Sequence, residues 1–119
     1  MSIQQQDLFA VLHRFGQSAG YRPKHGQRRD IVGVADRRTD YREAGGQMQY
    51  VRVLRLTVLK DATNETYGGI EFPDVGDMVT LDSVDYAFTG AAFNENSYGW
   101  ALEFQSTTIK RFGSNAGPQ

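Results

Sequence analysis

The chain has 119 residues, of which 39% are hydrophobic and 12% aromatic, and its formal net charge at pH 7 is −1. This length suits one domain with its own core, and the near-neutral charge disfavours a globally basic nucleic-acid binder. No apolar run approaches the roughly 20 residues of a membrane-spanning helix, and the N-terminus lacks the features of a secretory signal. Since the chain also has no cysteine, we expect synthesis in the cytoplasm, no disulfide framework and no membrane partner.

Residues 3–15 predict a short amphipathic helix. Ser2 stands where an N-cap belongs, and Gly16 stands where a C-cap belongs. The apolar side chains at helical spacing are Leu8, Val11, Leu12 and Phe15. This stripe must pack on the rest of the domain or on a neighbouring subunit.

The next segment, residues 21–29, is rich in cations and carries Pro23 and Gly26, so we expect an exposed basic loop. Its charged side chains are Arg22, Lys24, Arg28 and Arg29. Charge is also uneven along the chain, because residues 1–45 hold eight Lys or Arg against five Asp or Glu, and residues 46–119 hold five against nine. The loop is either a solvated connector or a contact for phosphate or an acidic partner.

Two strands with polar segments between them are predicted over residues 30–73. Residues 30–36 form a compact strand, and residues 37–46 form a long polar loop that is either a mobile hairpin tip or a partner contact. In the long strand over residues 47–60 the apolar alternation slips between Val53 and Leu54, which predicts a bulge or a sharp bend. Residues 61–69 form a second polar loop, and residues 70–73 form a short edge segment limited by its proline.

Residues 76–104 predict a three-stranded meander. Residues 78–81 lead through a tight Asp82-Ser83 turn into a strand that alternates with period two, and a polar loop over residues 94–97 precedes the last strand. The side chains expected to face inward are Val84, Tyr86, Phe88, Trp100, Leu102 and Phe104. Their spacing favours a packed core over a base-stacking platform, and the whole pattern predicts an all-β fold, a small antiparallel β-barrel with a short N-terminal helix and long polar loops.

A search for catalytic chemistry finds no nucleophile motif and no phosphate-binding glycine loop. His13 and His25 lack metal-ligand spacing, and no cysteine is present to complete a zinc site. Four carboxylates, which could also bind calcium, cluster at Asp74, Asp77, Asp82 and Asp85. Their spacing does not match an EF-hand, and acidic residues are common at turns. We therefore expect no enzymatic activity, no catalytic or metal site and no cofactor.

The order of these elements, with the segment GDMVTLD over residues 76–82 followed by VDYAF over residues 84–88, resembles the head-tail joining proteins of tailed phages. That family includes the phage lambda head-tail attachment protein and the head-closure, or stopper, proteins. The likeness covers roughly residues 29–106, and the loops at residues 37–46 and 61–69 are long for the family.

The resemblance implies a virion neck component that assembles as a homo-oligomeric ring between the portal or its adaptor and the tail, and helps to close the DNA channel. Residues 1–28 would be a helix and basic linker, residues 29–112 the barrel, and residues 113–119 a flexible tail. The basic residues Arg22, Lys24, Arg28 and Arg29 would meet packaged DNA, without reading its sequence, or an acidic partner. Contacts to neighbouring subunits or partners are expected at Arg37, Arg38, Tyr41, Arg42, Asn64, Tyr67, Asn94 and Tyr98. The alternatives are a tail terminator or other tail or baseplate protein and, from another class, a small nucleic-acid-binding β-barrel.

Overall fold

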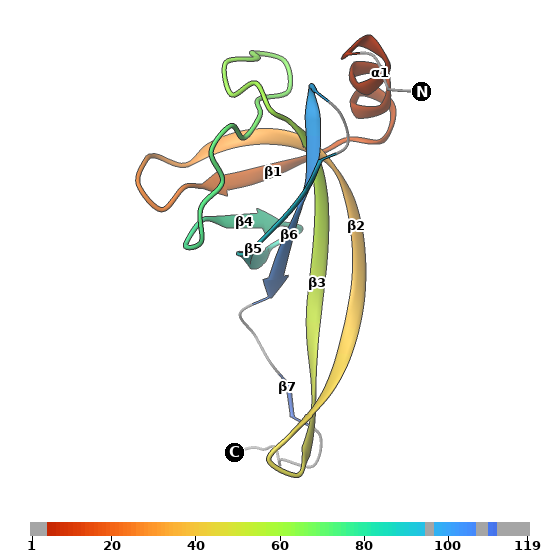
Figure 1. Cartoon of the computed structure of the whole chain (residues 1–119), viewed down its shortest axis with the longest axis vertical. Helices are drawn as coiled ribbons and strands as arrows, with labels where there is room; N and C mark the ends of the chain where they lie inside the picture. The colour runs from red at the N-terminus through yellow and green to blue at the C-terminus, as the bar shows by residue number, and fades with distance from the viewer. Residues whose placement is uncertain (1–4, 95–96, 107–109, 112–119) are drawn as a thin grey trace.

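The structure is a computed structural model that describes residues 5–94, 97–106 and 110–111 (Figure 1). Within these residues one helix, α1 (Gln5–Phe15), precedes seven strands, and most of the described residues lie in strands. The strands are β1 (Gln17–Arg22), β2 (Arg29–Ala44), β3 (Gln47–Leu59), β4 (Met78–Leu81), β5 (Val84–Asn94), β6 (Gly99–Ser106) and β7 (Lys110–Arg111). The predicted all-β class with a single short helix is confirmed.

Six of the strands close into an antiparallel barrel. They follow one another in the order β2-β1-β4-β5-β6-β3, and a further pairing between β2 and β3 joins the two ends. Closure gives each of the six strands a hydrogen-bonded neighbour on both sides, so none of them is an edge strand. The predicted small antiparallel barrel is therefore confirmed.

The interior of the barrel is filled by the side chains that the alternation pattern placed there. Tyr86, Phe88, Leu102 and Phe104 are buried, and the rings of Phe88 and Phe104 pack with their centroids 5.5 Å apart. Trp100 is partly buried against the same cluster and donates its indole N–H to the carbonyl of Ile70 at 3.0 Å. These aromatic rings belong to the core, as predicted, and are not available as a stacking platform.

Helix α1 packs on the outside of the barrel. Leu8 and Leu12 are buried against Leu59 at the end of β3, whereas Val11 and Phe15 are exposed, so only half of the predicted apolar stripe contacts the barrel. The expected helix end at Gly16 is confirmed, because its N–H donates to the carbonyl of Leu12 at 2.9 Å. The predicted N-cap, Ser2, lies outside the described residues.

Strand β1 occupies residues that the sequence assigned to the basic linker, and that part of the prediction was wrong. Tyr21, at the start of the expected exposed loop, is buried in the core cluster. The strand is only six residues long, and three consecutive residues of it, Ala19 to Tyr21, are buried. Its sequence therefore lacks the alternation that would have predicted a strand. The true connection between β1 and β2 is the shorter turn from Pro23 to Arg28.

The predicted polar loop over residues 37–46 is also wrong, because β2 continues to Ala44 and pairs in register with β3 from Val34↔Thr57 to Ala44↔Gln47. Gly45 and Gly46, at φ 61° and 77°, make a two-residue turn of the kind that favours glycine. We call the part of this hairpin between Arg38 and Val53 the arm; it projects from the barrel as the longest feature of the molecule (Figure 1). The sequence of residues 37–46 has no alternation of apolar and polar residues to mark a strand, which explains the error.

No bulge interrupts β3, so the bulge that was one of the two predicted alternatives at Val53 and Leu54 is wrong. Its register with β2 is continuous, and Val53 and Leu54 are both buried although they face opposite sides. Leu54 points into the barrel core, whereas Val53 lies on the outer face of the same strand. The apolar residues switch from one face of β3 to the other because each face is covered over a different part of the strand. The switch therefore requires no inserted residue in β3. The bulge that the barrel does contain lies in β5, between Phe88 and Ala92.

The remaining turns and loops agree with the sequence in part. Asp82 and Ser83 have φ 51° and 66°, which confirms the tight turn between β4 and β5. Residues 61–69 form a loop, as predicted, but the expected edge segment at residues 70–73 is not a strand. The Ile70 side chain is instead buried in the barrel core, and its N–H donates to the carbonyl of Leu59 at 2.9 Å. The expected flexible tail, residues 113–119, lies outside the described residues.

Candidate functional site

The four predicted basic contact residues all lie on the β1–β2 hairpin, but the structure divides them into two kinds. Arg22, Lys24 and Arg28 are exposed, and Arg28 makes only a loose 4.0 Å ion pair with Asp30. Arg29 is half-buried: its guanidinium donates to the carbonyl of Gly69 at 2.6 Å and lies 5.0 Å from the centroid of the Tyr21 ring. Three cations are therefore presented to solvent, while Arg29 ties the hairpin to the loop after β3.

Asp77, the first of the two acidic residues in the GDMVTLD segment, holds this hairpin in place. Its buried carboxylate accepts hydrogen bonds from the Tyr21 hydroxyl at 2.5 Å, the Lys24 N–H at 2.7 Å and the Asp74 N–H at 2.9 Å. Burial, together with the hydrogen bond to Asp77, raises the pKa of Tyr21 well above its ordinary value. Asp77 thus has a structural role, and one of the four carboxylates considered for calcium is already occupied by internal hydrogen bonds.

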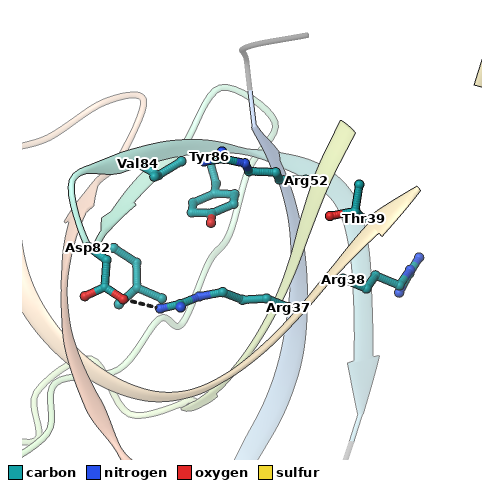
Figure 2. Close-up of a pocket in the computed structure, with 8 residues that line it drawn as sticks. Arg37, Arg38, Thr39, Arg52, Asp82, Val84 and Tyr86 are labelled. Carbon is teal, nitrogen blue, oxygen red and sulfur yellow. Dashed lines mark hydrogen bonds and ion pairs between the residues drawn. The ribbon is translucent and has the colours of Figure 1, made fainter. Parts of the chain in front are cut away.

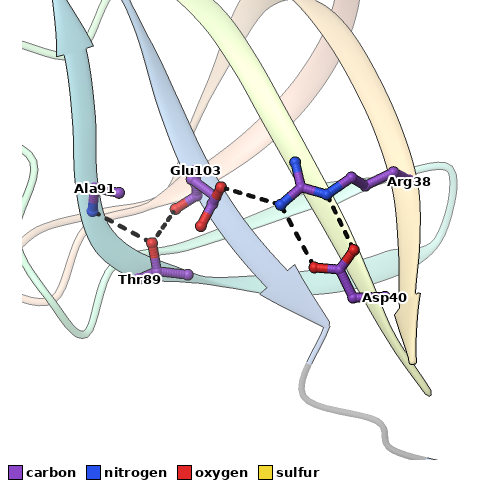
Figure 3. Close-up of polar contacts among 5 residues, drawn as sticks. All are labelled: Arg38, Asp40, Thr89, Ala91 and Glu103. Carbon is purple, nitrogen blue, oxygen red and sulfur yellow. Dashed lines mark hydrogen bonds and ion pairs between the residues drawn. The ribbon is translucent and has the colours of Figure 1, made fainter. Parts of the chain in front are cut away.

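At the base of the arm, the arginines face two different sides. Arg38 points to the outer face, where its guanidinium contacts Asp40 at 3.1 Å and Glu103 of β6 at 3.7 Å (Figure 3). Asp40 raises the pKa of the exposed Arg38 guanidinium above its usual value by hydrogen bonding and by its charge. Beside Glu103, the Thr89 hydroxyl donates to the Glu103 carbonyl at 3.1 Å (Figure 3). Arg38 is thereby held against the outer wall of the barrel.

The opposite face of the arm forms an open pocket of about 280 Å³ with the β4–β5 turn. Arg37 spans the opening to Asp82 at 2.5 Å, and the Tyr86 hydroxyl points between them (Figure 2). Leu81, Val84 and Tyr86 provide an apolar floor, and Thr39 and Arg52 stand on the wall made by the arm. We call this the arginine pocket. Within the part of the chain that the structure describes, no carboxylate pairs with the exposed Arg52.

Of the predicted contact residues, Arg37 and Arg38 line this pocket, although the Arg38 guanidinium is directed away from it toward Asp40 and Glu103. Tyr41 lies farther along the arm and is 62% exposed, which suits a contact residue. Arg42 is also on the arm and Asn94 ends β5, but both side chains lie outside the described residues. Arg52, Asp82 and Tyr86 were not predicted as site residues. The turn at Asp82 was the one signal in the sequence that pointed to this place.

The contact residues expected in the second loop serve internal contacts. The side-chain oxygen of Asn64 accepts from the N–H groups of Thr66 and Tyr67, at 3.0 and 2.8 Å. Tyr67 packs on Phe9 of α1 with ring centroids 5.6 Å apart. The loop is thus braced from within and fastens the helix to the barrel. Tyr98, the last residue of the set, is partly exposed beside Trp100 in a separate open pocket.

Several carboxylates of the acidic half of the sequence are matched within the chain to groups of the basic half. Arg37 pairs with Asp82, Arg38 approaches Glu103, and the β1–β2 hairpin binds Asp77. The linear division of charge is therefore not a clean division of the surface. Exposed cations are instead concentrated on the β1–β2 hairpin and at the arginine pocket.

The described residues contain no group of three or more metal-ligating side chains, and no helix among them could cross a membrane. No protein-family model matches the chain, and a comparison with curated proteins finds no match. Any function must therefore be argued from the barrel, its arm and these two charged surfaces.

Proposed function

We propose that this protein is a structural component of a tailed-phage neck, located in the virion, that joins the portal or its adaptor to the tail as a homo-oligomeric ring and has no enzymatic activity. The observation that carries the proposal is the arm. A closed barrel supplies a rigid body, and the continuous ladder between β2 and β3 extends past it from Arg38↔Val53 to Ala44↔Gln47. The resemblance of the GDMVTLD segment to head-tail joining proteins supports the same assignment.

The arm is suited to reach a neighbour because it is stiff. Its paired strands satisfy their own backbone hydrogen bonds, so little conformational entropy is lost when the arm docks. Its exposed Tyr41 offers a large aromatic contact on a polar strand. A feature of this kind can contact the next protein in the neck or help to close the channel.

The three exposed cations of the β1–β2 hairpin provide the second support. Arg22, Lys24 and Arg28 lie on one turn that Asp77 and Arg29 hold in a fixed position. Such a cluster contacts phosphates by charge without reading bases. In a ring, one such cluster per subunit would line the channel around packaged DNA.

Shortening the arm in register tests the proposed function. Removal of residues 41–44 and 47–50 deletes four cross-strand pairs and leaves Gly45-Gly46 as the turn between the paired residues Asp40 and Val51. An even deletion preserves which side chains face inward. It also removes the pairing of β3 with β7, which is not part of the six-strand barrel. We expect a folded barrel and normal expression.

The assay is complementation of a phage that lacks the gene. The shortened protein should yield filled heads that fail to join tails or that lose DNA, with infectious titre at the level of the deletion. A matched control, Gly45→Ala alone, tests the turn and should complement. Normal titre with the shortened arm would remove the arm from the mechanism, and normal titre without the gene would remove the neck assignment.

A tail terminator or another tail or baseplate protein remains the alternative among structural proteins, and particle location by electron microscopy distinguishes it. A nucleic-acid-binding barrel is favoured only by the exposed hairpin cations. Reversing the charges of Arg22, Lys24 and Arg28 should abolish weak, salt-sensitive and sequence-independent binding of duplex DNA. Tight binding that persists at high salt or prefers one sequence would favour the nucleic-acid-binding class instead.

A further inference from the structure

The loop that precedes β4 carries the most exposed large apolar side chain among the described residues. Phe72 is 82% exposed and Val75 is 58% exposed. Exposed carboxylates of Glu71 and Asp74 stand beside them. We call residues 71–75 the acidic loop. An aromatic ring this exposed, next to carboxylates, indicates an interaction surface.

The acidic loop is held in one shape at both ends. Before it, buried Ile70 accepts a hydrogen bond from the Trp100 indole at 3.0 Å. After it, Asp74 and Asp77 exchange two hydrogen bonds, one from the Asp74 N–H to the Asp77 carboxylate at 2.9 Å and one from the Asp77 N–H to the Asp74 carbonyl at 3.0 Å. Pro73 restricts the backbone between these anchors. The Phe72 ring is thus presented by a preorganised loop, which lowers the entropy cost of docking it.

The arginine pocket has the complementary features. Its floor of Leu81, Val84 and Tyr86 is apolar, and Arg52 on its wall has no carboxylate partner among the described residues. Its volume of about 280 Å³ exceeds the roughly 150 Å³ of a cavity that holds a benzene ring. One aromatic side chain with a carboxylate beside it therefore matches the pocket in size, polarity and charge.

We propose that the acidic loop of one copy enters the arginine pocket of a second copy, with Phe72 on the apolar floor and Asp74 beside Arg52. The two surfaces lie at opposite ends of β4, whose four residues separate Asp77 from Asp82 by roughly 17 Å of extended chain. Because the loop is anchored at both ends, it does not reach the pocket of its own chain. A contact between two different patches is head-to-tail, which is the type that closes into rings. The inference rests on the proposed ring assembly and names its interface.

The absence of cysteine from the chain makes a direct test available. Thr39→Cys places a thiol on the pocket wall, and Val75→Cys places one in the acidic loop. An equimolar mixture at high protein concentration under mild oxidation should form the mixed disulfide well above the twofold excess over each homodimer that random collision gives. A mixed disulfide at or below that twofold excess would overturn the proposal.

Second substitutions show whether the cross-link depends on the proposed contacts. Arg52→Glu in the pocket copy, or Phe72→Ala in the loop copy, should lower the yield of mixed disulfide by about tenfold, since each removes a central contact. Arg14→Glu in the pocket copy, an exposed arginine on α1 away from the pocket lining, is the matched control and should leave the yield unchanged. If Arg52→Glu lowers the yield of mixed disulfide and Asp74→Arg in the loop copy restores it, the pairing of Arg52 with Asp74 is supported and misfolding is excluded. A yield insensitive to both Arg52→Glu and Phe72→Ala would overturn it.

The same experiment separates this interface from the proposed function. A mixed disulfide with the expected dependence, but normal phage titre without the gene, would keep the self-association and remove the neck assignment. Failure of the cross-link, with complementation that requires the gene, would keep the neck assignment and place the subunit interface elsewhere.

Discussion

Asp77 should be the most sensitive polar position in the described part of the barrel. Its buried carboxylate accepts three hydrogen bonds, from Tyr21, Lys24 and Asp74. Each bond to a charged acceptor contributes about 1.5–3 kcal/mol net. In Asp77→Ala the buried Tyr21 hydroxyl loses its partner, whereas the two backbone N–H groups are part-buried and regain some water. We therefore expect a loss of about 3–5 kcal/mol in the free energy of unfolding.

Asp77→Asn sharpens the argument because it keeps the shape of the side chain. One oxygen of Asp77 accepts from the Lys24 N–H, and the other accepts from Tyr21 and from the Asp74 N–H. In either orientation the new amide NH₂ faces a backbone N–H, so one donor opposes another. We expect Asp77→Asn to lower the free energy of unfolding by about 1–3 kcal/mol, which is less than the loss expected for Asp77→Ala.

Urea unfolding followed by the fluorescence of the single tryptophan, Trp100, measures these changes. The matched control is Asp85→Ala, an exposed carboxylate that accepts from the Thr80 hydroxyl at 2.5 Å and should cost under about 1 kcal/mol. Hydrogen exchange at the Lys24 and Asp74 amides should accelerate in Asp77→Ala. If Asp77→Ala costs no more than the control, the carboxylate does not hold the β1–β2 hairpin and the reasoning is wrong.

Further variants test the core and the alkaline limb of stability. Phe88→Ala and Leu102→Ala should each cost about 2–5 kcal/mol in urea unfolding, because both side chains fill the barrel, whereas the exposed Thr89→Ala should cost under about 1 kcal/mol; equal costs at all three positions would contradict the inward face. The folded state raises the pKa of Tyr21 above its ordinary value of 10.0, so the unfolded chain releases the hydroxyl proton at a lower pH than the folded chain does. The stability that Tyr21 contributes is therefore fully present below about pH 10 and falls as the pH rises above it. Tyr21→Phe should be less stable near neutral pH but lose less stability between about pH 9 and pH 11, and an unchanged alkaline slope would refute this assignment.

The meander over residues 76–104 could be predicted from sequence because its determinants are local. Alternation of Tyr86 and Phe88 with polar neighbours sets which face is buried, and the Asp82-Ser83 turn sets the register of the hairpin. The helix could be predicted for the same reason, since Leu8 and Leu12 are spaced for one face. These local patterns do not depend on how distant segments of the chain pack.

Closure of the barrel decided what these signals could not. The sequence of residues 37–46 is mostly polar, and this segment is a strand only because β2 and β3 pair up to Ala44↔Gln47, so the expected loop could not be recognised as structure from composition. Strand β1 exists because it fills the gap between β2 and β4, and its own six residues carry too short a pattern. Pairing energy from distant strands overrides weak local preference in both cases.

The two charged sites depend entirely on tertiary contacts. Asp77 meets Tyr21 across 56 residues of sequence, and Arg37 meets Asp82 across 45. The arginine pocket combines the arm with the β4–β5 turn, segments that no spacing rule connects. The sequence by itself determined the class of fold, the core face of the meander and the presence of exposed cations, because these follow from periodicity and composition. Only the closed barrel decided which cations are braced, which remain free and which carboxylates they face, because those pairings form when distant strands are brought into register.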